Sequence, residues 1–219
     1  MIRFSVLILL SALSPAFGQD QPNLVTDGGG TPGGVARLIL SHRLYALGQA
    51  SKDPLTVLNA ARLAASVSLA DTQRVADTTE ALVGASASSP VGSTEMFATA
   101  EALAAENEAL LDLIDALRRD AVFAPDTVAN STPSTLAASQ TVAWPIPFFG
   151  ASLAEIGILG NGASNLDLRV VDENGHPVCL DISPGDIAYC SFYPARNGSF
   201  LVSVTNTGGA PDRYFLLTN

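Results

Sequence analysis

The hydrophobic periodicity of the chain changes once, and this change constrains the fold more than any other feature. Between residues 35 and 124, apolar residues recur three and four positions apart, which is the period of an amphipathic helix. From residue 141 onwards apolar and polar residues alternate, as around Leu166 and Leu168, which is the period of a half-buried strand. We therefore predict an α+β protein in two parts: an antiparallel α-helical bundle over 35–124, followed by an antiparallel β-sandwich over 141–219.

Capping residues predict the helix boundaries in the N-terminal part. A first helix starts at Val35, and Asp53 and Pro54 start a second, because Asp is a good N-cap and Pro fits the first helical position. Residues 72–83 either extend the second helix or form a short third one. A long final helix is expected over 93–121.

Three segments lie outside these two parts. Residues 1–18 combine Arg3, an apolar stretch and a small-x-small ending at Gly18, which predicts a signal peptide cleaved near Gly18-Gln19. The alternative is an uncleaved membrane anchor, although the apolar stretch is shorter than the roughly 20 residues that span a bilayer. Residues 19–34, rich in Gly and Pro, are expected to be a flexible leader, and 125–140, rich in Pro, Ser and Thr, a linker.

This organisation predicts a periplasmic or secreted protein with no transmembrane segment in the mature chain. The formal net charge of −10, with Lys52 as the only lysine, argues against a general nucleic-acid binder, which needs clustered cations. The alanines concentrate in the helical region: 22 of the 33 lie between residues 51 and 150.

The two cysteines of an exported chain are expected to form one disulfide. If Ser183 to Asp186 form a four-residue hairpin loop, Cys179 falls directly opposite Cys190, within the span of a disulfide. The same register places Leu180 and Ile182 on the opposite face, with Tyr189 and Ile187 as their partners, and we expect that face to be the core side.

The C-terminal segment resembles the bacterial pre-peptidase C-terminal domain family. The resemblance rests on the run from Asn165 to Asp172, on Phe192-Tyr193-Pro194, and on the apolar runs 200–206 and 214–219. It implies a jelly-roll-like β-sandwich that serves as an accessory domain of exported proteins, sometimes linked to calcium or to contact with a substrate surface. The first two helices, with the Leu44 to Gly48 turn, weakly resemble a tetratricopeptide-type hairpin.

No catalytic constellation is evident in the sequence. A Gly-x-Ser-x-Gly elbow is missing, and the two histidines, His42 and His176, are better explained as a packed helix residue and a surface turn residue. With the cysteines paired, no zinc ligand set remains. We predict that the chain is not an enzyme.

Oxygen ligands gather at one stretch of the sandwich, which makes calcium the only candidate cofactor. Asp167, Asp172 and Glu173 are the candidate ligands, because calcium is bound by six to eight oxygens. However, Asp167 and Asp172 point to opposite faces of an ideal strand. The alternative is a solvated strand end without a metal.

An aromatic cluster is the second candidate site. Trp144, Phe148 and Phe149 could form an exposed surface for a ligand or partner. The alternative is a first strand with core anchors, on a sheet edge that suits the neighbouring prolines.

The preferred function is an exported, non-enzymatic interaction module or envelope-associated module, with a protein or envelope-surface partner. The alternative is a calcium-binding accessory domain that assists a separate secreted hydrolase.

Overall fold

The computed structural model describes residues 21–25, 30–77, 89–121 and 125–219. The helices in these ranges are α1 (Gly34–Ser51), α2 (Pro54–Ala65), α3 (Ser93–Ala104) and α4 (Glu108–Ala121). The strands are β1 (Val67–Asp71), β2 (Thr127–Leu136), β3 (Thr141–Phe148), β4 (Ala154–Gly160), β5 (Leu166–Val171), β6 (Pro177–Asp181), β7 (Ile187–Phe192), β8 (Gly198–Asn206) and β9 (Asp212–Thr218). The prediction of an α+β chain is confirmed. The predicted signal peptide lies outside the described residues, and none of the described helices is long and apolar enough to cross a membrane.

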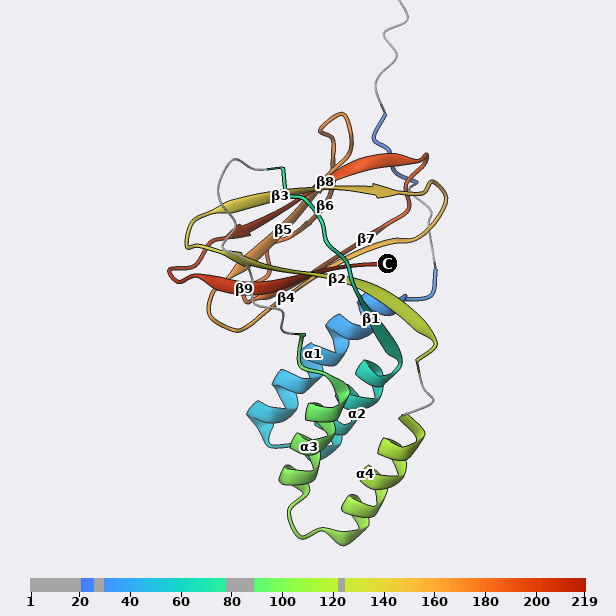
Figure 1. Cartoon of the computed structure of the whole chain (residues 1–219), viewed down its shortest axis with the longest axis vertical. Coiled ribbons are helices and arrows are strands. Elements are labelled where there is room, and N and C mark those ends of the chain that lie inside the picture. Colours follow the sequence, from blue (N-terminus) through green and yellow to red (C-terminus); the bar gives the residue numbers. More distant parts are fainter. Residues whose placement is uncertain (1–20, 26–29, 78–88, 122–124) are drawn as a thin grey trace, which may run out of the picture.

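The strands form two sheets that face each other, with the helices extending from one of them (Figure 1). One sheet has the strand order β1-β2-β9-β4-β7, and the other has the order β3-β8-β5-β6. All neighbouring strands are antiparallel except β1 and β2. β3, with its two prolines, is an edge strand, as expected for a segment that lacks two amide donors.

The main hydrophobic core lies between the two sheets and follows the period-two pattern of the sequence. Phe200, Val202 and Val204 alternate along β8 and are fully buried. The rings of Phe148, Phe192 and Phe200 pack against one another with centroids 4.9–5.9 Å apart. These observations support a β-sandwich, and its jelly-roll-like connectivity remains a prediction.

Two segments that were not expected to be strands belong to the five-stranded sheet. Residues 127–136, inside the predicted linker, form β2, which pairs with β9 on one side and β1 on the other. β1 directly follows α2, and residues 72–76, which were predicted to be helical, are neither helix nor strand. The linker prediction is wrong over β2 because this segment is paired on both sides and buries Ser131, Thr132 and Ser134. Thr132 Oγ1 donates to the carbonyl of Thr72 and accepts from Arg74.

The predicted long helix over 93–121 is two helices. Ala105 has a positive φ of 51°, which ends α3. The side chain of Asn107 then accepts a hydrogen bond from the amide of Leu110 and caps α4. Because of this break, α4 folds back beside α2 and α3.

Helix α1 joins the helical part to the sandwich. Val35, Leu38 and Ile39 pack against Leu159 of β4 and Leu217 of β9, on the outer face of the five-stranded sheet. β4 is therefore buried on both faces. At Gly157 of β4 a Cβ atom would lie 2.8 Å from the side chain of Val35, so glycine permits this close approach. The predicted helical bundle is thus not separate from the sandwich, because α1 belongs to both.

The predicted disulfide between Cys179 and Cys190 is confirmed, with a Cα–Cα distance of 5.9 Å. The predicted hairpin is wrong, because β6 pairs with β5, β7 pairs with β4, and the two strands lie in different sheets. The disulfide therefore joins the two sheets. The predicted core face is also wrong: Leu180 and Ile182 are each 60% exposed, whereas Cys190 points into the core.

Loss of the disulfide is expected to lower the free energy of unfolding by about 2–3 kcal/mol, because cross-linking a short loop removes chain entropy from the unfolded state. Urea unfolding of the oxidised and dithiothreitol-reduced protein measures the difference. A Cys179→Ala/Cys190→Ala double variant is the control and should not respond to reductant. Equal midpoints for the oxidised and reduced wild type would contradict the prediction.

Candidate functional site

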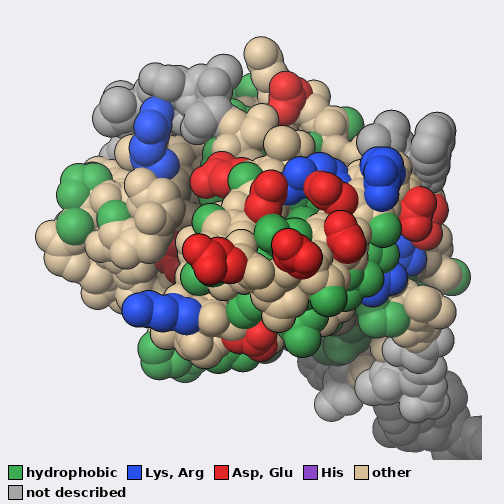
Figure 2. All heavy atoms as spheres, turned by 90° about the horizontal axis from the view of Figure 1, so that it is seen from below, with side chains coloured by type: hydrophobic (Ala, Val, Ile, Leu, Met, Phe, Trp, Pro, Cys, Tyr) green, Lys and Arg blue, Asp and Glu red, His purple; other side chains and the backbone are tan. Residues whose placement is uncertain are grey.

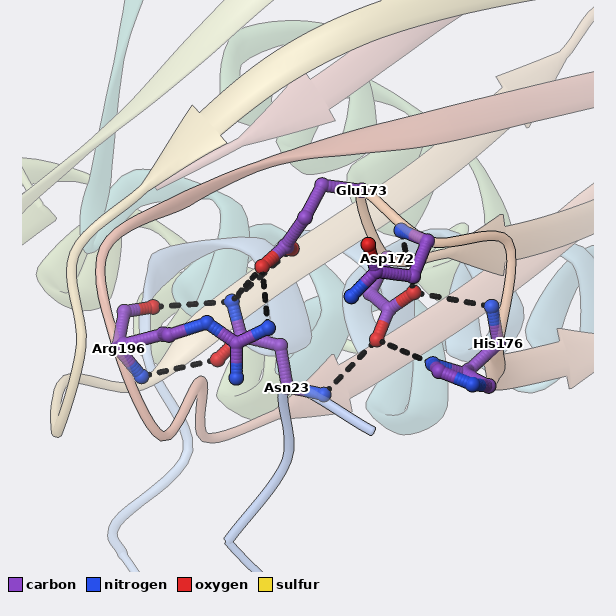
Figure 3. A network of polar contacts seen from close by, with 6 residues as sticks. Asn23, Asp172, Glu173, His176 and Arg196 are labelled. Carbon is purple, nitrogen blue, oxygen red and sulfur yellow. Dashed lines mark hydrogen bonds and ion pairs between the residues drawn. The ribbon is translucent and has the colours of Figure 1, made fainter. Parts of the chain in front are cut away.

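The segment just after the predicted signal peptide is held on the sandwich by a polar network (Figure 3). Asn23 is fully buried. Its amide donates to Asp172 Oδ2 at 2.9 Å, and its side chain donates to Glu173 and to the carbonyl of Arg196. In return, the amide of Arg196 donates to Asn23 Oδ1 at 2.9 Å. The prediction of a flexible leader over 19–34 is wrong at Asn23, because every polar group of its side chain is paired with the sandwich.

Asp172 is the centre of this network and directly follows strand β5. Its Oδ1 accepts from the amides of Asn174 and His176, and its Oδ2 lies 3.1 Å from His176 Nδ1. Burial of the carboxyl by itself raises the pKa of Asp172, but the amides of Asn23, His176 and Asn174 and the His176 ring outweigh it and lower this pKa to about 2. Gly175, with φ of 85°, lies in the turn between β5 and β6.

This lowered pKa predicts an acid-dependent loss of stability. The folded-state pKa lies below the ordinary value of 3.8, so the stabilisation is fully present above about pH 4 and is lost as the pH falls towards 2. The difference corresponds to about 2 kcal/mol. Chemical unfolding between pH 5 and pH 2 should show this extra loss in the wild type and in the control Asp167→Asn, but not in Asp172→Asn. The same pH dependence in all three proteins would contradict the assignment.

The candidate calcium ligands do not converge. Asp167 lies near the start of β5 and accepts from the side chain of Asn165, whereas Asp172 lies just past the strand's end. Glu173 is paired with Arg196 at 2.6 Å. Within the described ranges, no group of three or more His, Cys, Asp or Glu residues could hold a metal ion. Asp172 and Glu173 are bonded to the turn and to Asn23, whereas Asp167 is bonded to Asn165.

The aromatic cluster is divided between core and surface. Trp144 and Phe148 point into the core and are 1% and 8% exposed, so they cannot form an exposed binding surface. The indole Nε1 of Trp144 donates to the hydroxyl of Tyr214 at 3.2 Å. Phe149 is 76% exposed and is the one member of the cluster that a partner could reach.

The two histidines have different surroundings. His176 lies in the Asp172 network, as a turn residue. His42, on α1, has its Nε2 buried without a hydrogen-bond partner, and burial lowers its pKa to about 4, against the opposing effect of Asp186. Neither histidine is hydrogen-bonded to a serine or cysteine among the described residues.

A second buried carboxylate, that of Glu155, positions helix α1. The N-cap residue of α1, Gly33, has no side chain to cap the helix, and Glu155 of β4 takes this role. Its two carboxylate oxygens accept from the amides of Gly33 and Val35 at 2.9 and 3.2 Å. The hydroxyl of Tyr189 donates to the same carboxylate at 2.8 Å. Glu155 thereby fixes the start of α1 on the sheet.

An open groove lies between α2 and α4, and Arg37 of α1 completes its lining. Its volume is about 570 Å³, within the usual range of ligand pockets. It is lined by Arg37, Asn59, Arg62, Leu63, Ala65, Ser66, Leu117, Asp120 and Ala121. Of all the residues of α4, only Ile114 is fully buried. The apolar side of α4 is therefore incompletely covered where it faces the groove.

The groove differs in charge from the surface around it. Figure 2 looks onto the distal end of the helices and shows Asp and Glu side chains gathered there. The exposed carboxylates of α3, α4 and the turn between them are Glu95, Glu101, Glu106, Glu108, Asp112, Asp115 and Asp120. The groove itself is lined by two guanidinium groups and one carboxylate.

Sequence reasoning missed Asn23, Glu155 and the groove. The bonds of Asn23 to the sandwich and of Glu155 to the start of α1 span 120 to 173 positions, so no local pattern marks these residues. A signal for the groove was present: Leu110, Ile114, Leu117 and Ala121 form an apolar stripe on a helix that is otherwise rich in charged residues.

The sequence matches no protein-family model and no curated protein. Solved structures resemble part of the chain at low TM-scores. A periplasmic inhibitor of g-type lysozyme from Aeromonas hydrophila has a TM-score of 0.31 and 11% identity, over 42% of this chain and 86% of that one. A pre-peptidase C-terminal domain of a collagenase from Bacillus anthracis has a TM-score of 0.25 and 12% identity, over 42% and 76%.

A carbohydrate-binding module, BiXyn10A CBM1, has a TM-score of 0.28 and 12% identity, over 40% of this chain and 72% of that one. The resemblance to a tetratricopeptide-type hairpin finds no support in these comparisons. At these TM-scores the likeness assigns neither a family nor an activity to the chain.

Proposed function

We propose that the chain is an exported, non-catalytic interaction protein, in which the β-sandwich is a rigid scaffold and the helical part binds a partner protein. The observation that carries this proposal is the open groove beside α4, whose apolar side is incompletely covered. Exposed apolar surface with a polar rim is typical of a binding site. The disulfide is in keeping with export, because such bonds persist in oxidising compartments.

The hydrogen bonds of the buried polar groups support a scaffold role for the sandwich. Asp172, Glu155 and Asn23 are all hydrogen-bonded to structural partners, so none is free to act on a substrate. The helices leave the sheet through α1, whose start is held by Glu155. The groove is therefore held in a fixed position relative to the sandwich.

Site-specific photocrosslinking in cells that export the protein tests the proposal. A photoreactive residue at Asn59 or Asp120, on opposite sides of the groove, is expected to give the same covalent adduct. The control position is Leu180, which is 60% exposed on the sandwich. The adducted protein, once purified, should bind the wild type and should lose that binding with Asn59→Trp, which fills the groove. Equal adducts at all three positions, or none at Asn59 and Asp120, would overturn the proposal.

A further inference from the structure

We infer that the groove binds a peptide segment of its partner that carries leucine-sized apolar side chains next to a carboxylate, and that Arg62 pairs with this carboxylate. The inference rests on the proposed function, because it names the chemistry of the partner at the same groove. Three observations carry it: the apolar lining, the bonding of the two arginines, and the position of Asp120.

The apolar lining of the groove comes from two helices. Leu63 and Ala65 belong to α2, and Leu117 and Ala121 belong to α4. Ala65 is buried. Leu63, Leu117 and Ala121 are only partly buried, so these three side chains keep exposed surface that a ligand can contact. Leucine-sized side chains of a partner would remove this surface from water, which is favourable by roughly 25 cal/mol per Å².

The two arginines at the rim are not equivalent. Arg37 Nη1 lies 2.5 Å from Asp126 Oδ1 and 3.5 Å from Ser66 Oγ, so its charge is already balanced. The side chain of Arg62 is exposed and makes no hydrogen bond or ion pair with a described residue. An unpaired guanidinium presents five donors in a fork that matches a carboxylate. A cation without a partner in the described part of the chain, next to apolar lining residues, favours an occupant that is both anionic and apolar.

Asp120 is the one carboxylate in the groove lining, and its replacement gives a second test of the expected charge of the partner. It is exposed and has no ion pair among the described residues. An incoming carboxylate is repelled by it, so removing its charge should tighten binding. A partner that relied on apolar contact alone would not respond to this change.

Selection of random twelve-residue peptides against the purified protein tests the inference. The enriched peptides are expected to share large apolar residues and at least one Asp or Glu. Binding of a selected peptide should weaken about tenfold with Arg62→Glu and strengthen about two- to threefold with Asp120→Asn. Arg119→Glu is the matched control, since it makes the same charge change on an exposed arginine outside the groove lining, and should alter binding less than twofold. Replacing the peptide's acidic residue by Lys should restore binding to Arg62→Glu.

The remaining outcomes separate this inference from the proposed function. Enriched peptides without an acidic residue, or an equal effect of Arg62→Glu and Arg119→Glu on binding, would overturn the inference. The proposed function would still stand in that case if the photocrosslinks are specific to the groove. Dodecanoate is the probe for a lipid occupant. If dodecanoate binds, if this binding depends on Arg62, and if no peptide is enriched, the groove is a fatty-acid site and the inference is overturned. Absence of both enriched peptides and photocrosslinks would overturn both. Circular dichroism of each variant must show the wild-type helix content.

Discussion

Replacing Trp144 with alanine is expected to lower the free energy of unfolding by about 4 kcal/mol. Truncating a buried tryptophan loses its apolar contacts and leaves a cavity, which costs roughly 3–5 kcal/mol. Trp144 is 1% exposed, and its Nε1 donates to the hydroxyl of Tyr214. Burial raises the pKa of Tyr214 to about 12, so the phenol stays neutral in the core. Urea unfolding followed by circular dichroism measures the loss.

Phe149→Ala is the matched control, five positions along the same aromatic cluster. Its ring is 76% exposed, so its removal should change stability by less than about 0.5 kcal/mol. Trp144→Phe keeps an aromatic ring but loses the hydrogen bond to Tyr214, and should fall between the two. A loss below about 1 kcal/mol for Trp144→Ala would mean that the cluster is not a core anchor.

Replacing Glu155 with alanine is expected to cost about 3 kcal/mol and to loosen α1 from the sheet. The carboxylate is fully buried and accepts from two amides at the start of α1 and from Tyr189. Removing it leaves buried donors without a partner, at a cost of roughly 1–3 kcal/mol each before relaxation. Hydrogen exchange should accelerate at the amides of Gly33 and Val35 before any change in the interior of the sandwich.

The control for this prediction is Glu95→Ala, which removes an exposed carboxylate from the first turn of another helix. It should cost less than about 1 kcal/mol, because an exposed charge near a helix start contributes only a fraction of that amount. Glu155→Gln keeps one acceptor oxygen and should lie between the two variants. If exchange in α1 were unchanged in Glu155→Ala, another contact would be holding the helix.

Local patterns predicted the elements where the pattern and the burial agree. Leu166, Leu168 and Val170 alternate with polar residues, and all three are fully buried in β5. The cysteine pairing was also predicted correctly, although from a hairpin that does not exist. β6 and β7 are consecutive strands that enter different sheets, and Cys179 still lies within reach of Cys190 across the sandwich.

Local patterns failed where tertiary contacts reversed the expected environment. β2 has the composition of a linker, yet Ser131, Thr132 and Ser134 are buried in the sheet. A small hydroxyl side chain can be buried at low cost if a partner is supplied, and Arg74 supplies one to Thr132. Asn23 was likewise assigned to a flexible leader because its partners lie about 150 positions or more further along the chain.

The sequence by itself determined the two periodicities, and therefore α1, α2 and the strands from β3 onwards, together with the disulfide. The tertiary structure alone decided that α1 lies on β4, that Glu155 caps it, and that α4 leaves a groove beside Arg62. The physical reason is the range of the interactions. Periodicity records which face of an element avoids water, whereas a buried carboxylate or an open groove depends on which distant elements meet there.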